Sequence, residues 1–470
     1  MSGQTLASTP ELVNLICRLY HGRGLAKALS VSKTFFNAAI PLVWREVAGV
    51  HNILGLLSFA RVEPVSSEKG KTKDIRIGRE RLIVYAPYVQ RLEVLPLGVN
   101  DYIVEGWLGS PDFNPVENPL LPNLRSLAIG KFGSGGHNQI LWIKTLFSSS
   151  LTSITVDMRL APPQRIPEVS AIAILKYVRA NCPAIQRLHL FHDNSDADPP
   201  ASTNKSSAWI YTSYFQPSYY ENLAGFQLRD LGCSMRIFSI SSVEMLNTLS
   251  SLESLNLYAP DYEPPLFEVS LQLPNLKHIG LHYAEPYHIE VVQQSDLLFG
   301  LESFEIVFVK GDPNAAELWD EDWRSDTIRW ICQCSLLRKL VIDAGVINFV
   351  LPTELAEMTS ALPLTDVCLK GSVLGSLSDA SKFWPKVTRF YWDMSCQLAD
   401  LLHLTGQPNL QHLGLKLVQS NTSDVHLYNG TPTLPALQTF ELLGWPFTLG
   451  PDLSFTAQYV YQIGVDPKSF

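Results

Sequence analysis

Apolar residues along this chain recur in a fixed phrase from residue 87 to residue 442. The phrase is Pro-x-Φ-x-x-Φ-x-Φ, where Φ is a bulky apolar residue and the first Φ is called the anchor. The anchors lie at Val89, Leu124, Leu151, Ile185, Leu223, Leu252, Leu276, Leu301, Leu337, Leu364, Val387, Leu410 and Leu437. A period of about 29 residues is typical of a solenoid, in which each repeat buries its apolar face against its neighbours.

Proline distinguishes this phrase from chance spacing of apolar residues. It stands two residues before the anchor at Pro87, Pro122, Pro183, Pro274, Pro385, Pro408 and Pro435. Proline cannot continue a helix, and it favours extended geometry in the residue before it. The proline therefore marks the place where a returning helix meets a strand. The alternative is an ordinary large α/β domain with alternating helices and strands.

The copies resemble leucine-rich repeats of the long, irregular kind, with the pattern L-x-x-L-x-L followed by Asn or Cys and a helical return. The Asn after the third Leu is mostly absent here. Segments with helical spacing of apolar residues separate the copies, at Val169–Val178, Ile240–Leu249 and Cys396–Leu404. The resemblance implies an α/β solenoid, a horseshoe with a parallel sheet on its concave face and helices outside.

The first fifty residues do not follow this period. They predict three short helices at Pro10–Tyr20, Leu25–Ser30 and Lys33–Ile40. So small a helical unit cannot bury a sufficient core alone, which indicates a partner. We therefore expect a helical domain at 1–50, a connecting segment and first cap at 51–86, and about 13 repeats at 87–470.

Three groups of residues in this N-terminal segment resemble an F-box. The opening matches at Pro10, Glu11, Leu12, Val13 and Ile16, the middle at Val31, Lys33 and Phe35, and the close at Pro41, Leu42, Val43, Trp44, Arg45 and Val47. Thr9 and the segment 24–26 depart from the family pattern. An F-box docks on the S-phase-kinase-associated adaptor of cullin-type (SCF) ubiquitin ligases. The resemblance implies adaptor-binding residues Pro10, Leu12, Ile16, Leu25, Val31 and Lys33.

Composition and charge favour an intracellular protein without a nucleic-acid partner. The net charge is −9, which argues against a nucleic-acid or anionic-membrane surface. The start of the chain lacks a signal-peptide pattern, and no apolar run is long enough to span a membrane. Seven cysteines without framework spacing fit a reducing compartment. We expect a cytoplasmic or nuclear location.

No motif for catalysis, a cofactor or a metal emerges from the sequence. Cys332 and Cys334 lack a second Cys or His pair at ligand spacing. Cys182 and Cys334 each precede an anchor by three residues, where a small apolar side chain can pack. His282 and His288 are expected to be solvated loop histidines. The prediction is a chain that is not an enzyme.

The exposed positions of the concave face are predicted to bind a protein target. They flank the second and third Φ residues and are Arg187, His189, Phe191, Arg229, Tyr258, His282, Arg389, Tyr391, Asp393 and Lys416. Their arginines suggest an acidic or phosphorylated segment as the target. A second candidate is the loop with Trp319 and Trp323, which can either bind a basic peptide or pack on the solenoid flank.

Two functions follow from these patterns. The first is a non-catalytic substrate-recognition subunit of an SCF ubiquitin ligase, with the F-box on the adaptor and the repeats on a protein target. The alternative is a ligase-independent scaffold whose N-terminal helices only cap the array.

Overall fold

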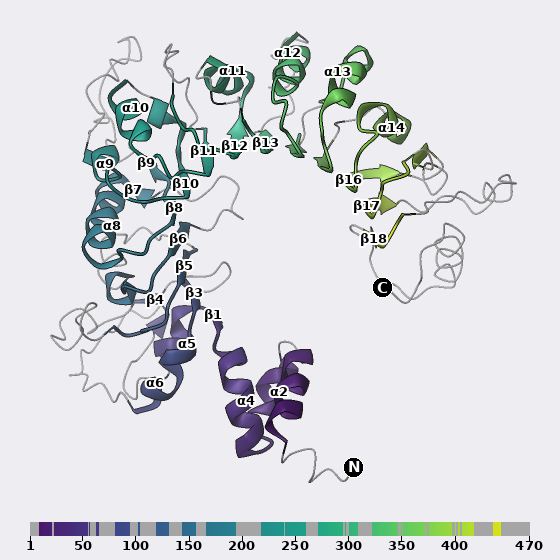
Figure 1. The fold of residues 1–470 in the computed structure, drawn as a ribbon. Coiled ribbons are helices and arrows are strands. Elements are labelled where there is room, and N and C mark those ends of the chain that lie inside the picture. The colour runs from purple at the N-terminus through teal and green to yellow at the C-terminus, as the bar shows by residue number, and fades with distance from the viewer. Residues whose placement is uncertain are drawn as a thin grey trace, which may run out of the picture. The chain divides into compact units, whose positions relative to one another are not determined.

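The computed structural model shows two units, Met1–Cys233 and Ser234–Phe470, each built around parallel strands (Figure 1). The structure describes residues 9–20, 23–54, 56, 63–64, 80–94, 102–103, 119–130, 143–156, 166–193, 218–238, 240–259, 271–294, 297, 300–308, 322–345, 349, 351–371, 373, 376–396, 400, 403–404, 407–417 and 436–442.

The first unit begins with the three predicted helices. They are α2 (Pro10–Leu19), α3 (Arg23–Ala28) and α4 (Lys33–Val43). Ser32 caps α4, since its hydroxyl accepts a hydrogen bond from the backbone N–H of Phe35 at 3.3 Å. The helices share a core of Val13, Cys17, Leu25, Ala28 and Ala39. This small core is separate from the core under the sheet.

The sheet of the first unit is parallel, with its strands in chain order. The order is β1 (Glu46–Ala48), β3 (Arg91–Val94), β5 (Ser126–Ile129), β6 (Ser153–Val156), β8 (Arg187–His189) and β10 (Asp230–Ser234). The helices of this part are α5 (Val50–Leu54), α6 (Glu80–Tyr85), α8 (Glu168–Asn181) and α9 (Ser218–Glu221). Two short pairs complete it: β2 (Glu63–Pro64) with β4 (Tyr102–Ile103), and β7 (Ile166–Pro167) with β9 (His192–Asp193).

The second unit repeats the same plan. Its strands are β11 (Ser254–Tyr258), β12 (His278–Ala284), β13 (Ser303–Phe308), β14 (Lys339–Asp343), β15 (Asp366–Lys370), β16 (Arg389–Cys396), β17 (His412–Leu417) and β18 (Thr439–Leu442). Its helices are α10 (Ile240–Asn247), α11 (Pro286–Gln294), α12 (Asp322–Ile331), α13 (Ala356–Ala361) and α14 (Ala380–Phe383). Helices α11 to α14 lie on one side of the strands (Figure 1). The predicted α/β leucine-rich-repeat solenoid is confirmed.

A forked hydrogen bond links neighbouring repeats at most of the junctions that the structure describes. The backbone N–H groups of Lys277 and His278 both donate to the carbonyl of Glu253, at 2.9 and 3.0 Å. A carbonyl oxygen has two lone pairs and can accept both bonds. The same fork recurs on the carbonyls of Arg45, Gln90, Arg125, Thr152, Gln186, Lys277, Glu302, Arg338, Thr365 and Thr388. Apart from Arg45, which follows no predicted anchor, each of these acceptors comes one residue after a predicted anchor, so the hydrogen bonds confirm the predicted register there.

The forked hydrogen bonds correct the predicted start of the repeats and the position of one anchor. Arg45 accepts a fork from Gln90 and Arg91, so the series begins at Trp44, within residues 1–50. In the repeat that contains β10, the backbone N–H groups of Arg229 and Asp230 donate to the carbonyl of Gln186. In the other repeats the two donors come one and two residues after the anchor, so the anchor here is Leu228. The anchor predicted at Leu223 is therefore wrong.

The error at Leu223 has a physical origin. Leu223, Phe226 and Leu228 have the spacing of the phrase, and all three are buried. Leu223, however, closes a turn after α9, where its N–H donates to Tyr220. The strand starts only after Gly225, whose φ of +85° lets the chain reverse. The helix expected at Cys396–Leu404 also differs, because Cys396 ends β16.

The Pro-Asn-Leu copies add a side-chain bond between repeats. Asn123 Nδ2 donates to the carbonyl of Pro87 at 2.7 Å, and Asn275 Nδ2 donates to that of Ser250 at 2.8 Å. Each bond satisfies a carbonyl of the preceding repeat, one turn before its strand. The asparagine therefore ties neighbouring repeats together.

Replacing Asn275 by alanine should lower the free energy of unfolding by about 0.5–1.5 kcal/mol, the usual net value of one such hydrogen bond. Urea unfolding of the full chain measures this change. Asn409→Ala is the matched control, because Asn409 holds the same place in its copy but makes no side-chain hydrogen bond among the described residues. Equal effects of the two substitutions would contradict this role.

Candidate functional site

The N-terminal helical segment exposes four large apolar side chains. Leu15 is 56% exposed, Leu19 73%, Tyr20 54% and Val31 64%. On α2, Leu15 and Leu19 are one turn apart and so lie on the same face of the helix. Val13 and Cys17 point into the helical core instead. Large apolar side chains left exposed in this way are typical of a protein-binding surface.

The residues predicted to bind the adaptor occupy three environments. Pro10, Val31 and Lys33 are exposed, and Leu12 and Ile16 are half-buried. Leu25 is only 9% exposed and packs within the helical core, which is a correction to its predicted contact role. The exposed Leu15, Leu19 and Tyr20 are absent from the predicted contact set. Leu15 and Leu19 form one apolar stripe with Leu12 and Ile16 in the sequence, but the spacing alone does not distinguish the buried side of the stripe from its exposed side.

The helices are joined to the first repeat by two contacts. The ring of Trp44 lies on that of Tyr85, with centroids 4.7 Å apart. Directly after Trp44, β1 pairs with β3 through Val47 and Leu92. Both contacts lie within the first unit, and they continue the helical segment into the sheet.

The sheet of each unit has a polar face, here called the open face. It carries the residues two and four positions after each anchor, because the second and third Φ residues point into the core. In β8, Leu188 is fully buried, whereas Arg187 is exposed and His189 half-buried. The prediction that these alternate positions differ in burial is confirmed.

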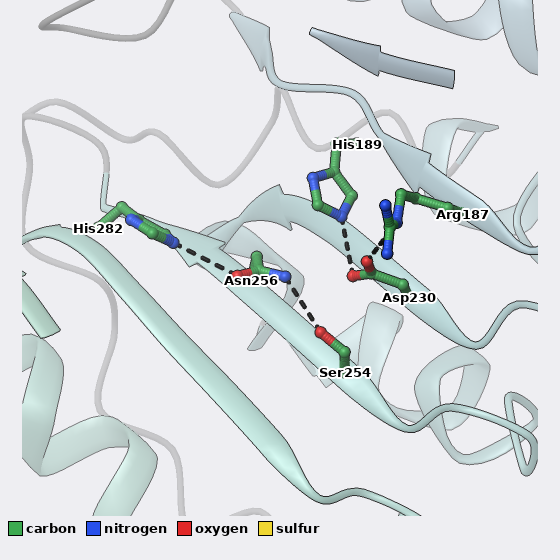
Figure 2. Close-up of polar contacts among 6 residues, drawn as sticks. All are labelled: Arg187, His189, Asp230, Ser254, Asn256 and His282. Carbon is green, nitrogen blue, oxygen red and sulfur yellow. Dashed lines mark hydrogen bonds and ion pairs between the residues drawn. The ribbon is translucent and has the colours of Figure 1, made fainter. Parts of the chain in front are cut away.

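A charged cluster occupies the open face of the first unit (Figure 2). Asp230 of β10 accepts from Arg187 Nε at 2.6 Å through one oxygen, and its other oxygen lies 2.8 Å from His189 Nε2. The His189 ring lies over Gly232, where an added Cβ would come within 2.7 Å of the ring. Glycine is thus required there for the ring to lie on the sheet. The sequence alone did not single out Asp230.

Two predicted target residues of this unit lie elsewhere. Arg229 aligns with Gln186 in the turn before the strand, because the anchor is Leu228. The residue that pairs with Arg187 on the adjacent strand is Asp230, not Arg229. Phe191 is 3% exposed. It lies beyond β8, where its carbonyl accepts from Ile166, so the strand alternation that predicted its exposure has already ended.

The open face of the second unit begins with a polar ladder (Figure 2). Asn256 donates to Ser254 Oγ at 3.2 Å, and its amide oxygen lies 3.4 Å from His282 Nε2. The His282 ring stacks on that of Tyr258, with centroids 4.6 Å apart. Tyr258 is only 6% exposed, because this stack covers it. Its predicted exposure is therefore wrong, whereas His282 is half-buried on the face.

Backbone strain follows directly after His282. The pairing of β12 with β13 shifts between His282 and Ala284, and Tyr283 between them has a φ of +58°. Positive φ is uncommon outside glycine, and such bulges are often found beside functional sites. The bulge changes the direction of the chain at the end of the His282 strand.

The remaining predicted residues lie on β16 and β17. Arg389 is exposed and sits 3.8 Å from Asp366. Tyr391 lies flat over Gly414, since an added Cβ there would come within 2.4 Å of its ring. Asp393 accepts from the backbone N–H of Gly371 at 3.1 Å, which fixes the turn after β15. Lys416 is exposed.

The arginines that suggested an acidic target are already paired in part. Arg187 binds Asp230, and Arg389 lies near Asp366. Both carboxylates belong to the adjacent strand and lower the positive potential of the face. Preference for an acidic or phosphorylated segment stays a prediction.

The tryptophan loop is described only at its end. Trp323 belongs to α12, and its ring centroid lies 5.5 Å from that of Phe308 and 5.2 Å from that of Phe349. Of the two alternatives, Trp323 therefore packs on the flank. Trp319 lies outside the described residues.

Two cysteines singled out in the sequence are buried in the repeats. Cys182 and Cys334 are each 1% exposed and pack before their anchors, as predicted. Burial raises the pKa of both thiols to about 12. Within the described ranges, no three His, Cys, Asp or Glu residues gather closely enough to hold a metal ion.

Among the helices of the described residues, none has the length and apolarity to cross a membrane.

His288 is a correction to the expected solvated histidine. It is 1% exposed in α11, and its Nδ1 accepts from the backbone N–H of Glu285 at 3.0 Å. Burial lowers the pKa of His288 to about 4. The ring is therefore neutral at physiological pH.

Folding stability should fall on acidification from pH 7 to pH 4.5, in part through His288. The unfolded chain takes up this proton near the ordinary pKa of 6.5 and the folded chain only near 4, so protons stabilise the unfolded state in this window. The linked loss is about 2–3 kcal/mol. Urea unfolding at both pH values measures it, with His288→Phe as the reference for the other titrating groups. An unchanged pH dependence in this variant would refute the assignment.

Comparison with known proteins adds likeness of fold only. No protein-family model and no curated protein matches the chain. Among solved structures, an internalin of Listeria monocytogenes has a TM-score of 0.29 and 12% identity, covering 74% of this chain and 92% of its own. The Toll–Spätzle complex of Drosophila has a TM-score of 0.26 and 13% identity, with 83% and 44% covered. A leucine-rich-repeat protein of Leptospira interrogans has a TM-score of 0.23 and 13% identity, with 85% and 96% covered.

Proposed function

We propose that this chain is the substrate-recognition subunit of an SCF-type ubiquitin ligase. In this proposal the N-terminal helices dock on the S-phase-kinase-associated adaptor, and the repeats bind a protein target in the cytoplasm or nucleus. The chain itself performs no chemistry. It raises the effective concentration of the target's lysines near the ubiquitin donor.

The observation that carries this proposal is the exposed apolar surface of α2 and the segment after α3. The helices retain their own core while Leu15, Leu19, Tyr20 and Val31 remain exposed. A helical unit that served only as a cap would direct such residues toward the array. Their exposure supports an apolar groove on another protein as the binding site.

A second candidate function is a ligase-independent scaffold. The contact of Trp44 with Tyr85 and the pairing of β1 with β3 favour it, because a terminal cap must cover the first repeat. A protein-interaction role of the repeat fold is common to both candidates. They differ in what the exposed leucines bind.

Co-purification separates these candidates. The full chain is expressed with the recombinant adaptor and a cullin and is then captured by a tag on the chain. Under the ligase proposal, the adaptor and cullin elute with the chain as a stable complex. Elution of the chain alone, as a folded protein, would refute the ligase role and favour the scaffold.

A further inference from the structure

A continuous row of side chains crosses the open face of the second unit. Strand pairing places Glu305 of β13 beside Val341 of β14, Cys368 of β15, Tyr391 of β16 and Gly414 of β17. These five residues, here called the middle row, occupy the same position in successive repeats. The row runs across the strands, so a ligand lying along it contacts five repeats.

One end of the middle row carries a carboxylate, that of Glu305. Glu305 is half-buried and has no hydrogen bond or ion pair among the described residues. Strand pairing places Gly280 of β12 on one side of it and Val341 on the other, and neither residue offers a side-chain donor. Burial raises the pKa of Glu305 above its ordinary value, although Lys339 and Lys370 partly oppose this. A half-buried carboxylate that makes no hydrogen bond has lost part of its hydration, and an incoming cation would compensate it.

The rows on either side of the middle row are close to neutral. One side carries Lys339, Asp366 and Arg389, and the other carries Asp343, Lys370 and Asp393. The charges alternate in sign along each side. Over β13 to β16 these six charges cancel in sum, so Glu305 leaves a net negative charge there, which favours a cationic ligand group over an anionic one.

The rest of the middle row carries no charged side chain. Val341 is 8% exposed, Cys368 is half-buried, and the Tyr391 ring lies over Gly414. Aromatic and aliphatic surface without charge is typical of the centre of a protein interface.

Strand spacing fixes how a ligand would match this row. Three strand spacings of about 4.8 Å separate Glu305 from Tyr391, or roughly 14 Å. An extended peptide rises about 3.3 Å per residue, and its residues i, i+2 and i+4 share one face. A side chain at i+4 therefore reaches Tyr391 when that at i meets Glu305, and i+2 lies between Val341 and Cys368.

We propose that the middle row binds an extended segment of a partner protein with an arginine or lysine at one position and apolar residues two and four positions away. The cation pairs with Glu305, and the apolar side chains lie on Val341, Cys368 and Tyr391. This deepens the target-binding part of the proposed function. It does not depend on the adaptor.

Peptide binding to the full chain tests this proposal. The probes are the fluorescein-labelled peptides Gly-Arg-Ser-Leu-Ser-Leu-Gly and Gly-Leu-Ser-Leu-Ser-Arg-Gly, which cover both chain directions. We expect at least one to bind with a Kd below about 1 mM. Glu305→Gln should weaken that binding about 10- to 100-fold, as expected for loss of a charge-assisted pair. Replacing the peptide's arginine by neutral citrulline should have a similar effect, with no further loss in the Glu305→Gln variant.

Two controls locate the site. Glu302→Gln makes the same chemical change in the same repeat, but Glu302 precedes β13 and pairs with Lys277 at 3.3 Å, so binding should change less than about twofold. Alkylation of Cys368 by iodoacetamide, followed by mass spectrometry, should slow when the peptide is bound. Cys332, in the turn after α12, serves as the unaffected reference thiol.

Three results would overturn the proposal. The first is that neither peptide binds. The second is that Glu302→Gln weakens binding as much as Glu305→Gln does. The third is that peptides with phosphoserine in place of arginine bind more tightly. The last result would restore the acidic target. Adaptor capture by Glu305→Gln should equal that of the unchanged chain, so failure of this proposal is distinguishable from failure of the ligase role.

Discussion

Replacing Leu15 and Leu19 together by aspartate should abolish capture of the adaptor. Both side chains are more than half exposed on one face of α2, so the variant keeps the helical core of Val13 and Cys17. In the complex, the two carboxylates would lie unpaired in an apolar interface, which is strongly unfavourable. Co-purification with the recombinant adaptor measures the loss.

A matched control uses an exposed polar face of the same helix, about 100° around the axis from Leu15 and Leu19. Asn14 and Arg18 are also one turn apart on α2 and are exposed. Asn14→Asp with Arg18→Asp adds carboxylates at the same spacing and should retain adaptor capture. If both double variants bind equally well, the apolar surface is not the docking site, and the scaffold candidate is favoured.

The repeat architecture could be predicted because it depends on local sequence. Each strand needs two buried residues separated by one facing the other way, and each junction from helix to strand accepts proline. The repeat of β5 meets both conditions, since Leu127 and Ile129 are fully buried and Pro122 stands before the strand. The helices at Pro10–Leu19 and Ile240–Asn247 followed from apolar spacing for the same reason.

The face residues were harder to predict because their environment comes from the next strand. Tyr258 has the alternation of an exposed residue, but the His282 ring on β12 covers it. Arg187 looks like an available cation until Asp230 of β10 is placed beside it. That pairing requires Leu228 as the anchor, and the apolar spacing fits Leu223 equally well. Strand register, which is a property of two repeats together, decides such cases.

Glu305 shows the same limitation at the proposed peptide site. In the sequence it is one acid between Phe304 and Ile306, both of which are buried. Its significance comes from Gly280 and Val341 on either side, which leave the carboxylate without a donor. No pattern within a single repeat identifies it.

Leu255→Ala should lower the free energy of unfolding by about 2–5 kcal/mol, the usual range for a buried leucine. Leu255 is fully buried in β11, and β12 places Ile279 beside it. Removing its side chain leaves a cavity that the packed repeats can close only in part. Urea unfolding measures the change. Leu336→Ala is the matched control, because Leu336 is 54% exposed and should cost less than about 0.5 kcal/mol. A similarly small cost at Leu255 would show that the register of β11 is incorrect.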